Sequence, residues 1–213
     1  MGLVFSAFQP WWRNVFAFLF WVMASSSFAG ENSFNSYGQI GLVEMLTAES
    51  APDGLITLSQ TYFDGTLRTT FTSQIFPRLS ASFRYAGHGK NGEQALGFSN
   101  WDRSFDVRFR FIDEGNVTPA FAIGLKDFIG TGRYSSEYIV ATKSHKNLSF
   151  SLGLGFGRLA SYGGFSNPLG ALHQGFKVRE NRESGVGGEI EAAQWFQGMP
   201  QYLVGLKLGC QTV

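Results

Sequence analysis

The strictest constraint on the fold is an alternation of apolar and polar side chains over residues 101–111, WDRSFDVRFRF. Aromatic residues such as Trp101 and Phe105 share one parity, and charged residues such as Asp102 and Arg108 share the other. Successive side chains of a β-strand point to opposite faces, whereas a helix would mix the two sets. The segment is therefore predicted to be a strand between an apolar and a polar medium. The pattern alone leaves open whether the apolar medium is a protein core or a lipid bilayer.

Other stretches of the chain also have the character of strands. The chain contains 27 glycines and 22 phenylalanines with only 15% charged residues, a mixture that suits many strands joined by glycine turns. We expect an all-β fold, an antiparallel meander of about nine strands, most of them ~8 to 11 residues long and close to the length that crosses a bilayer. The expected strands are residues 54–63, 66–76, 79–86, 101–112, 119–126, 136–144, 147–157, 187–196 and 201–208.

The connections between these strands alternate in length. Tight turns are expected at 113–118, 145–146 and 197–200, and long loops at 88–100, 127–135 and 158–186. Outer-membrane β-barrels have short periplasmic turns and long outer loops, whereas a soluble sandwich follows no such rule. Loop alternation and strand length together favour lipid as the apolar medium.

The N-terminus has the pattern of a secretory signal. Residues 1–29 contain one cation, Arg13, then an apolar run, then the small residues SSSFA. We expect cleavage between Ala29 and Gly30. A transmembrane helix is the alternative, but it needs ~20 apolar residues and this run is about half as long.

The predicted mature chain has two parts. Residues 30–53 form an N-terminal segment, and the stretch 37–54, which overlaps its end, is either a short inward segment or the first strand. Residues 54–213 form a partial β-barrel domain, which we expect to be truncated. The single cysteine, Cys210, allows neither an intrachain disulfide nor a cysteine-based zinc site, and no cysteine that could accept a lipid anchor follows the signal.

The sequence contains no pattern typical of an enzyme. It lacks a phosphate loop, an HExxH motif and a nucleophile elbow, so we expect no catalytic site, no cofactor and no metal. A barrel lipase built from loop serines and histidines is the enzymatic alternative, with His88, His145 and His173 in turns or loops. Near-balanced charge, 17 basic against 16 acidic residues, argues against nucleic-acid binding.

Strand parity directs charged residues toward the interior of the expected barrel. Mixed acids and bases there can line a hydrated path and hydrogen-bond the hydroxyls of a passing polar ligand. They can equally form a ladder of ion pairs that fills the barrel. The candidate residues are Arg84, Asp102, Asp106, Arg108 and Arg110.

Several blocks of the sequence resemble a known family. The blocks are GQIGLVEMLTAESAPDG, RTTFTSQIFPRLSASFRY, DRSFDVRFRFIDEG, PAFAIGLKDFIGTGRYSSEYIVATK, GLGFGRL and GGFSNPL. Together they are similar to the YjbH (also GfcD) family of exopolysaccharide and capsule biosynthesis proteins, from about Tyr37 to the end of the chain.

This resemblance implies a non-enzymatic outer-membrane β-barrel that serves secretion of an extracellular polysaccharide. Its expected partners are outer-membrane lipid, the polysaccharide and other polysaccharide-export proteins. Asp127, Arg133 and Tyr134, in the long loop 127–135, are then expected to contact the glycan.

The chain departs from the family pattern in two ways. Family members are several times longer, which suggests a truncated gene or a fragment, and some are lipoproteins. About nine strands would also be unusual for a bacterial single-chain barrel, in which even numbers prevail. We expect the chain alone to form an open sheet, whose edges lipid cannot satisfy. The alternatives are a general outer-membrane pore or small barrel unrelated to polysaccharide, and a secreted soluble sandwich that binds sugar through exposed aromatic residues.

Overall fold

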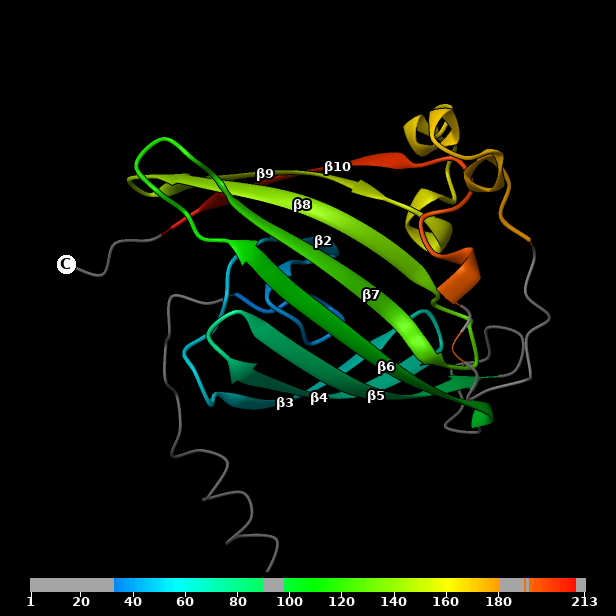
Figure 1. Cartoon of the computed structure of the whole chain (residues 1–213). Coiled ribbons are helices and arrows are strands. Elements are labelled where there is room, and N and C mark those ends of the chain that lie inside the picture. Colours follow the sequence, from blue (N-terminus) through cyan, green and yellow to red (C-terminus); the bar gives the residue numbers. More distant parts are fainter. Residues whose placement is uncertain (1–32, 90–97, 181–189, 191, 210–213) are drawn as a thin grey trace, which may run out of the picture. The chain divides into compact units, whose positions relative to one another are not determined.

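The computed structural model describes residues 33–89, 98–180, 190 and 192–209. Its main element is one antiparallel sheet in which each strand pairs with the next along the chain (Figure 1). The prediction of an all-β antiparallel meander is thereby confirmed. Within the described residues the sheet has eight strands: β3 (Ile56–Phe63), β4 (Thr66–Phe76), β5 (Leu79–Gly89), β6 (Phe98–Ile112), β7 (Ala120–Gly130), β8 (Ser136–His145), β9 (Leu148–Gly155) and β10 (Gln201–Leu208).

The alternation that predicted β6 also describes its two faces. Phe105 is 43% exposed and Phe109 46%, whereas Asp106 is 2% exposed and Arg108 6%. The charged parity therefore faces the interior and the aromatic parity faces outward. This orientation is the reverse of the one in a water-exposed antiparallel sheet, where the polar face lies outside.

The strand register extends the outward apolar face across the sheet. Directly paired residues form two continuous rows of apolar side chains, one from β3 to β7 and one from β5 to β10. The first row is Leu58, Phe71, Phe83, Phe105 and Ile129. The second row is Leu79, Phe109, Ile123, Ile139, Leu154 and Tyr202.

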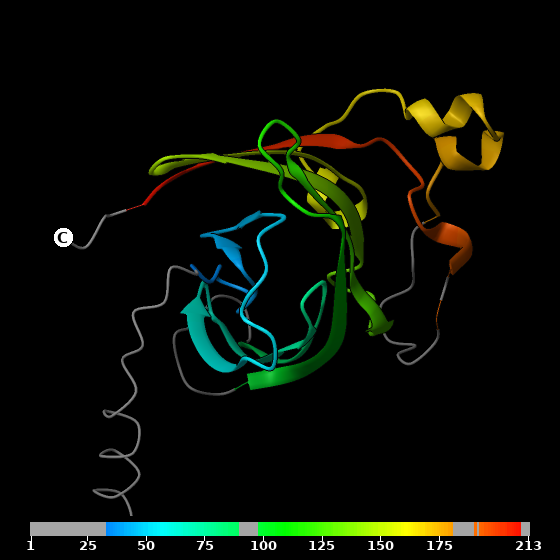
Figure 2. The same ribbon diagram turned by 60° about the vertical axis from the view of Figure 1, so that its left-hand side comes forward.

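The N-terminal segment lies on the inner side of the curved sheet, which bends around it (Figure 2). It forms a small hairpin of β1 (Gly41–Leu42) and β2 (Met45–Leu46). Leu46 and Ala48 pack there in a buried cluster with side chains of β7 and β8. The sheet's contribution to the cluster is Ala120, Ala122, Tyr138 and Val140. Of the two possibilities for residues 37–54, the inward segment is confirmed.

Polar contacts tie this segment to strands across the sheet. The Thr72 hydroxyl of β4 donates to the Gly38 carbonyl over 2.7 Å. The Ala48 amide donates to the Thr142 hydroxyl of β8 over 2.8 Å. Lys207 of β10 pairs with Glu49, with 3.0 Å between Nζ and Oε2. Residues 33–51 are thus anchored from one side of the sheet to the other.

The expected strand 187–196 is wrong for its described residues, 190 and 192–196, whereas 187–189 and 191 lie outside the described residues. Residues Ala192–Gln194 form a short 3-10 helix, η4, and β10 pairs directly with β9. The long connection between these strands contains three further 3-10 helices: η1 (Gly157–Ala160), η2 (Pro168–Ala171) and η3 (Gln174–Lys177). The tight turn expected at 197–200 is the end of this connection rather than a hairpin turn.

A buried carboxylate of β8 binds two residues of the connection between β9 and β10. Glu137 of β8 is 1% exposed, and the Arg179 guanidinium donates two hydrogen bonds of 2.6 and 3.0 Å to its carboxylate. The Phe196 amide donates to the same carboxylate over 2.9 Å. The Glu137 carboxylate thus satisfies the Arg179 side chain and the Phe196 amide without a strand next to Phe196. The connection is thereby held at the end of β8.

The structure shortens one expected loop and does not describe the expected signal. The loop expected at 127–135 shortens to residues 131–135, because β7 continues to Gly130. The expected signal at 1–29, with cleavage between Ala29 and Gly30, lies outside the described residues.

The described strands do not close into a barrel, and whether they form part of one stays a prediction. β3 and β10 each have one neighbour in the main sheet and form its two edges. Among the described residues, no helix combines the length and the apolar character needed to span a membrane.

Candidate functional site

The inner face of β4 to β7 is lined with buried polar side chains, and we take it as the candidate site. Cross-strand pairing places them in rows. Arg68, Ala86 and Asp102 form one row, and Thr72, Ser82 and Asp106 form another. Rows of this kind follow directly from the side-chain alternation of neighbouring strands.

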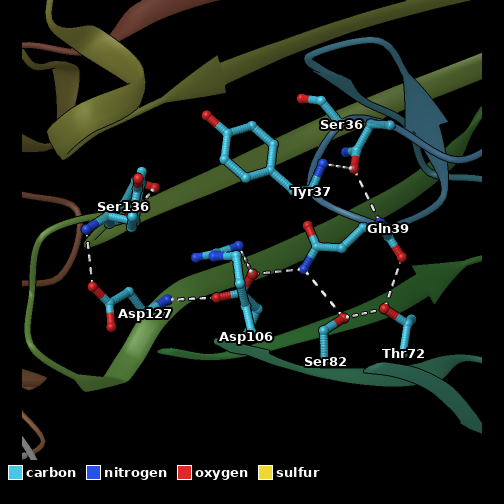
Figure 3. A network of polar contacts seen from close by, with 12 residues as sticks. Ser36, Tyr37, Gln39, Thr72, Ser82, Asp106, Asp127 and Ser136 are labelled. Carbon is cyan, nitrogen blue, oxygen red and sulfur yellow. Dashed lines mark hydrogen bonds and ion pairs between the residues drawn. The ribbon is translucent and has the colours of Figure 1, made fainter. Parts of the chain in front are cut away.

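Asp106 is the centre of a hydrogen-bond network (Figure 3). Its Oδ2 accepts from Arg84 Nη1 over 3.1 Å and from Gln39 Nε2 over 2.9 Å. Its Oδ1 accepts from the Asp127 amide over 2.7 Å. One carboxylate thereby joins β5, β7 and the N-terminal segment.

Next to this network, cations gather around two tyrosine rings. The guanidinium carbon of Arg68 lies 5.1 Å from the centre of the Tyr37 ring and 5.8 Å from that of Tyr134. The corresponding distances for Arg84 are 5.3 and 4.9 Å. Lys126 Nζ lies 3.6 Å from the centre of the Tyr37 ring. All these distances are within the range of cation–π attraction.

A bulge in β7 explains why two successive charged residues point inward. Opposite Phe105 and Val107 of β6 the register shifts, so that their partners are Ile129 and Leu125. Lys126 and Asp127 between these partners are both buried, and Asp127 has a φ of 53°, in the left-handed region. A bulge of this kind re-aims side chains that alternation would otherwise send to opposite faces.

The predicted interior residues fall into two groups. Arg84, Asp102 and Asp106 are buried in this region. Arg108 is buried further along β6, where its Nη1 donates to the Thr47 carbonyl over 3.1 Å. Arg110 pairs instead with Asp113 of the following turn, with 3.0 Å between Nε and Oδ1, and is only partly buried. Four of the five residues are therefore buried on the inner face, and Arg110 lies at the strand end.

The three residues expected to contact a glycan from an outer loop differ in burial. Asp127 is completely buried, and its Oδ2 accepts from the Tyr134 amide over 2.9 Å. Tyr134 is buried as well, whereas Arg133 is exposed. Asp127 and Tyr134 thus belong to the polar interior, and their contact with a glycan stays a prediction.

A small cavity lies beside Arg108, between the N-terminal segment and β4 and β5. Its volume is about 10 Å³, which is room for about one water molecule. Polar side chains on its wall include Gln39, Thr72, Gln74 and Ser80. In this arrangement the N-terminal segment occupies the inner side of the sheet next to Arg108.

Sequence reasoning missed Tyr37, Gln39, Arg68 and Lys126. Arg68 could have been found, because it has the inward parity of an expected strand. Burial raises the pKa of the Tyr37 phenol above its usual value, and Glu44 adds to the rise against the opposing effect of Arg68 and Arg84. The ring therefore remains neutral at pH 7 and offers its π-face, not a charge, to the cations. Among the described residues, no group of His, Cys, Asp and Glu side chains is arranged to hold a metal ion.

Comparison with known proteins identifies the family. Residues 33–209 match the family YjbH, described as exopolysaccharide biosynthesis protein YbjH. A relative from Escherichia coli (strain K12), named uncharacterized lipoprotein YjbH, is 32% identical over 171 residues, which cover 78% of this chain and 24% of that protein. No solved structure matches. The match to the family extends over nearly all of the described residues, and the chain therefore belongs to the YjbH family of exopolysaccharide biosynthesis proteins.

Proposed function

We propose that this chain is part of an outer-membrane β-barrel that serves export of an exopolysaccharide without catalysing a reaction itself. The membership in the YjbH family supports the link to polysaccharide, and the lipoprotein relative supports export to a membrane. The chain spans 24% of that relative's length, so the proposal concerns the part that this chain contributes.

The observation that carries the membrane proposal is the inversion of the sheet. Its outward side presents the two apolar rows, and its inward side presents charged and hydroxyl groups. Water would disfavour so large an apolar face, whereas a lipid environment favours apolar-out, polar-in strands. β4 to β8 contain 10 to 15 residues each, enough for a tilted strand to cross a bilayer.

The polar interior supports a role in handling a hydrophilic polymer. Its acids and bases are of the kind that hydrogen-bond sugar hydroxyls, and they lie on strands rather than on loops. In the proposed barrel Arg84, Asp102, Asp106 and Arg108 line the glycan path, Arg110 lies at its end and Asp127, Arg133 and Tyr134 contact the glycan. The filling of the interior by residues 33–51 favours a specific export component over an open general pore.

Two experiments test the two halves of this proposal. For the membrane half, cells producing the chain are fractionated, and the protein is run on gels with and without heating. We expect recovery in the outer-membrane fraction and faster migration of the unheated form. Recovery in a soluble fraction, without a heat-dependent shift, would support the soluble sandwich instead.

For the export half, Asp106 and Arg108 are both exchanged for Ala in the full-length gene context, and secreted polysaccharide is measured. We expect secretion to fall while the heat-dependent shift persists. Unchanged secretion from a normally assembled protein would make these residues structural filling. Neighbouring genes for polysaccharide synthesis would favour export over a general pore.

A further inference from the structure

The polar interior contains buried nitrogen donors for which the described residues provide no hydrogen-bond acceptor. Arg68 Nε and Nη1 are buried without a hydrogen-bond partner, and so are Arg84 Nε and Nη2. Arg84 has one partner, Asp106, through Nη1. Arg68 and Lys126 are buried as well and form no ion pair with the described residues.

Buried cations without hydrogen-bond acceptors lower the stability of the fold unless a bound group provides the acceptors. Burial of an unpaired cation is strongly unfavourable, and the neutral Tyr37 and Tyr134 rings compensate only part of the loss of hydration. The free N–H groups of two guanidiniums are a good match for the oxygens of a carboxylate or a phosphate, which accept charge-assisted hydrogen bonds.

Unpartnered acceptors lie in the same interior. Asp102 Oδ2 and Asp127 Oδ1 are buried and accept no hydrogen bond from the part of the chain that the structure describes. Asp102 lies in the same cross-strand row as Arg68, with the small side chain of Ala86 between them. At the usual strand spacing the two backbones are then about 10 Å apart. A ligand that carries an anionic group together with hydroxyl donors would satisfy both sides.

We propose that Arg68, Arg84 and Lys126, enclosed by Tyr37 and Tyr134, form a binding site for the anionic group of an acidic sugar, whose hydroxyls donate to Asp102 and Asp127. A uronic acid carboxylate and a sugar phosphate share the required chemistry. Arg158 supplies a further cation next to Tyr134, since its guanidinium carbon lies 5.2 Å from the centre of that ring, and its side chain is exposed. The assignment of the ligand to a sugar rests on the proposed function, whereas the binding of an anion does not.

The test is titration calorimetry on the full chain purified in detergent. The probes are trigalacturonate, inorganic phosphate and the neutral maltotriose. We expect trigalacturonate to bind and maltotriose not to bind. Arg68→Gln is expected to weaken trigalacturonate binding at least about tenfold, because it removes a charge-assisted partner of the carboxylate. Arg103→Gln is the matched control: it removes one positive charge from an exposed position on the outward face of β6 and is expected to leave binding unchanged.

Arg68 decides the test because it makes no hydrogen bond or ion pair with the described residues. Arg68→Gln should therefore melt at the same temperature as the wild type or higher, measured by circular dichroism, while binding is lost. Equal trigalacturonate binding by wild type and Arg68→Gln, or equal binding of maltotriose, would overturn the proposal. So would the failure of both anions, trigalacturonate and phosphate, to bind.

The two anion probes separate the possible sources. Trigalacturonate binding that phosphate does not displace assigns the site to a uronic acid, and phosphate binding alone assigns it to a phosphorylated sugar. Export itself is measured separately by secretion and by the heat-dependent shift. A chain that assembles in the outer membrane and supports secretion but binds no anion would refute this inference and leave the proposed function intact.

Discussion

Asp106 is the residue whose hydrogen bonds connect most segments of the polar interior. Its carboxylate joins Arg84, Gln39 and the Asp127 amide, and its side chain is almost fully buried. We expect Asp106→Ala to lower the free energy of unfolding by about 3–5 kcal/mol, because it leaves the buried Arg84 without a counterion. Urea unfolding in detergent, followed by tryptophan fluorescence, measures the loss.

Asp113→Ala is the matched control for this prediction. Asp113 also pairs with two arginines, Arg78 and Arg110, but its side chain is 46% exposed. An exposed pair contributes about 0–1 kcal/mol, so the two variants should differ clearly. Equal losses would mean that the interior around Arg84 is as well hydrated as the surface.

Glu114 should give the turn between β6 and β7 a pH dependence. Partial burial alone would raise the pKa of its carboxyl, but hydrogen bonds from the Ser144 amide and from Lys143 outweigh this and hold the pKa below its usual value. A lowered pKa in the folded state stabilises the fold above the unfolded pKa, and this contribution disappears as the pH falls through the folded value. We expect Glu114→Gln to flatten the decline of the urea midpoint between about pH 5 and pH 3. An unchanged slope would contradict the role of Glu114.

Sequence reasoning was most successful for residues on regular strands. Alternation alone identified the inward orientation of Asp102, Asp106 and Arg108. Alternation could not predict that the side chains of Lys126 and Asp127 both face inward, because the bulge in β7 interrupts the alternation at that point. The contacts of Tyr37 and Gln39 join segments far apart in the chain, and no local pattern encodes them.

Among the elements, the N-terminal segment and the β9–β10 connection required the structure. Residues 37–54 carried signals for two arrangements, and only their packing against β7 and β8 distinguishes them. The wrong strand at 187–196 has a physical cause that is also long-range. Glu137 accepts from Arg179 and from the Phe196 amide, and hydropathy around residue 190 gives no indication of these partners.

The close approach of the N-terminal segment to β10 can be tested by a disulfide. A Cβ atom added to Gly205 would lie 3.5 Å from the Met45 Cβ, within the range that a disulfide bridges. We expect Met45→Cys with Gly205→Cys, in a Cys210→Ser background, to form the bond in mild oxidant. The bond should stabilise the fold by about 2–4 kcal/mol, because it closes a long loop in the unfolded chain.

Mobility on non-reducing gels detects the bond, and urea unfolding with and without reductant measures its effect. Met45→Cys alone, in the same Cys210→Ser background, is the control that cannot form this bond. A double variant that stays reduced would mean that the hairpin of β1 and β2 does not rest on β10.

At the level of the whole molecule, the sheet is the reverse of a soluble one. Its interior is filled by polar groups and a short N-terminal segment, and its outer face carries most of the large apolar side chains. The two edges, β3 and β10, leave backbone groups that need a partner in lipid. The proposed barrel would therefore need further strands to pair with both edges.

The medium around this sheet can be identified by placing a charge at two depths. Phe105 lies near the middle of β6 and Phe111 near its end, and the two are exposed to a similar extent, 43% and 41%. In a bilayer Phe105→Lys should cost about 2–4 kcal/mol and Phe111→Lys about 0–1 kcal/mol, because a charge near the interface can reach water. In water both substitutions at exposed positions should change stability by less than about 0.5 kcal/mol. Urea unfolding in lipid vesicles measures both, and equal small effects would place the apolar face against protein or water rather than lipid.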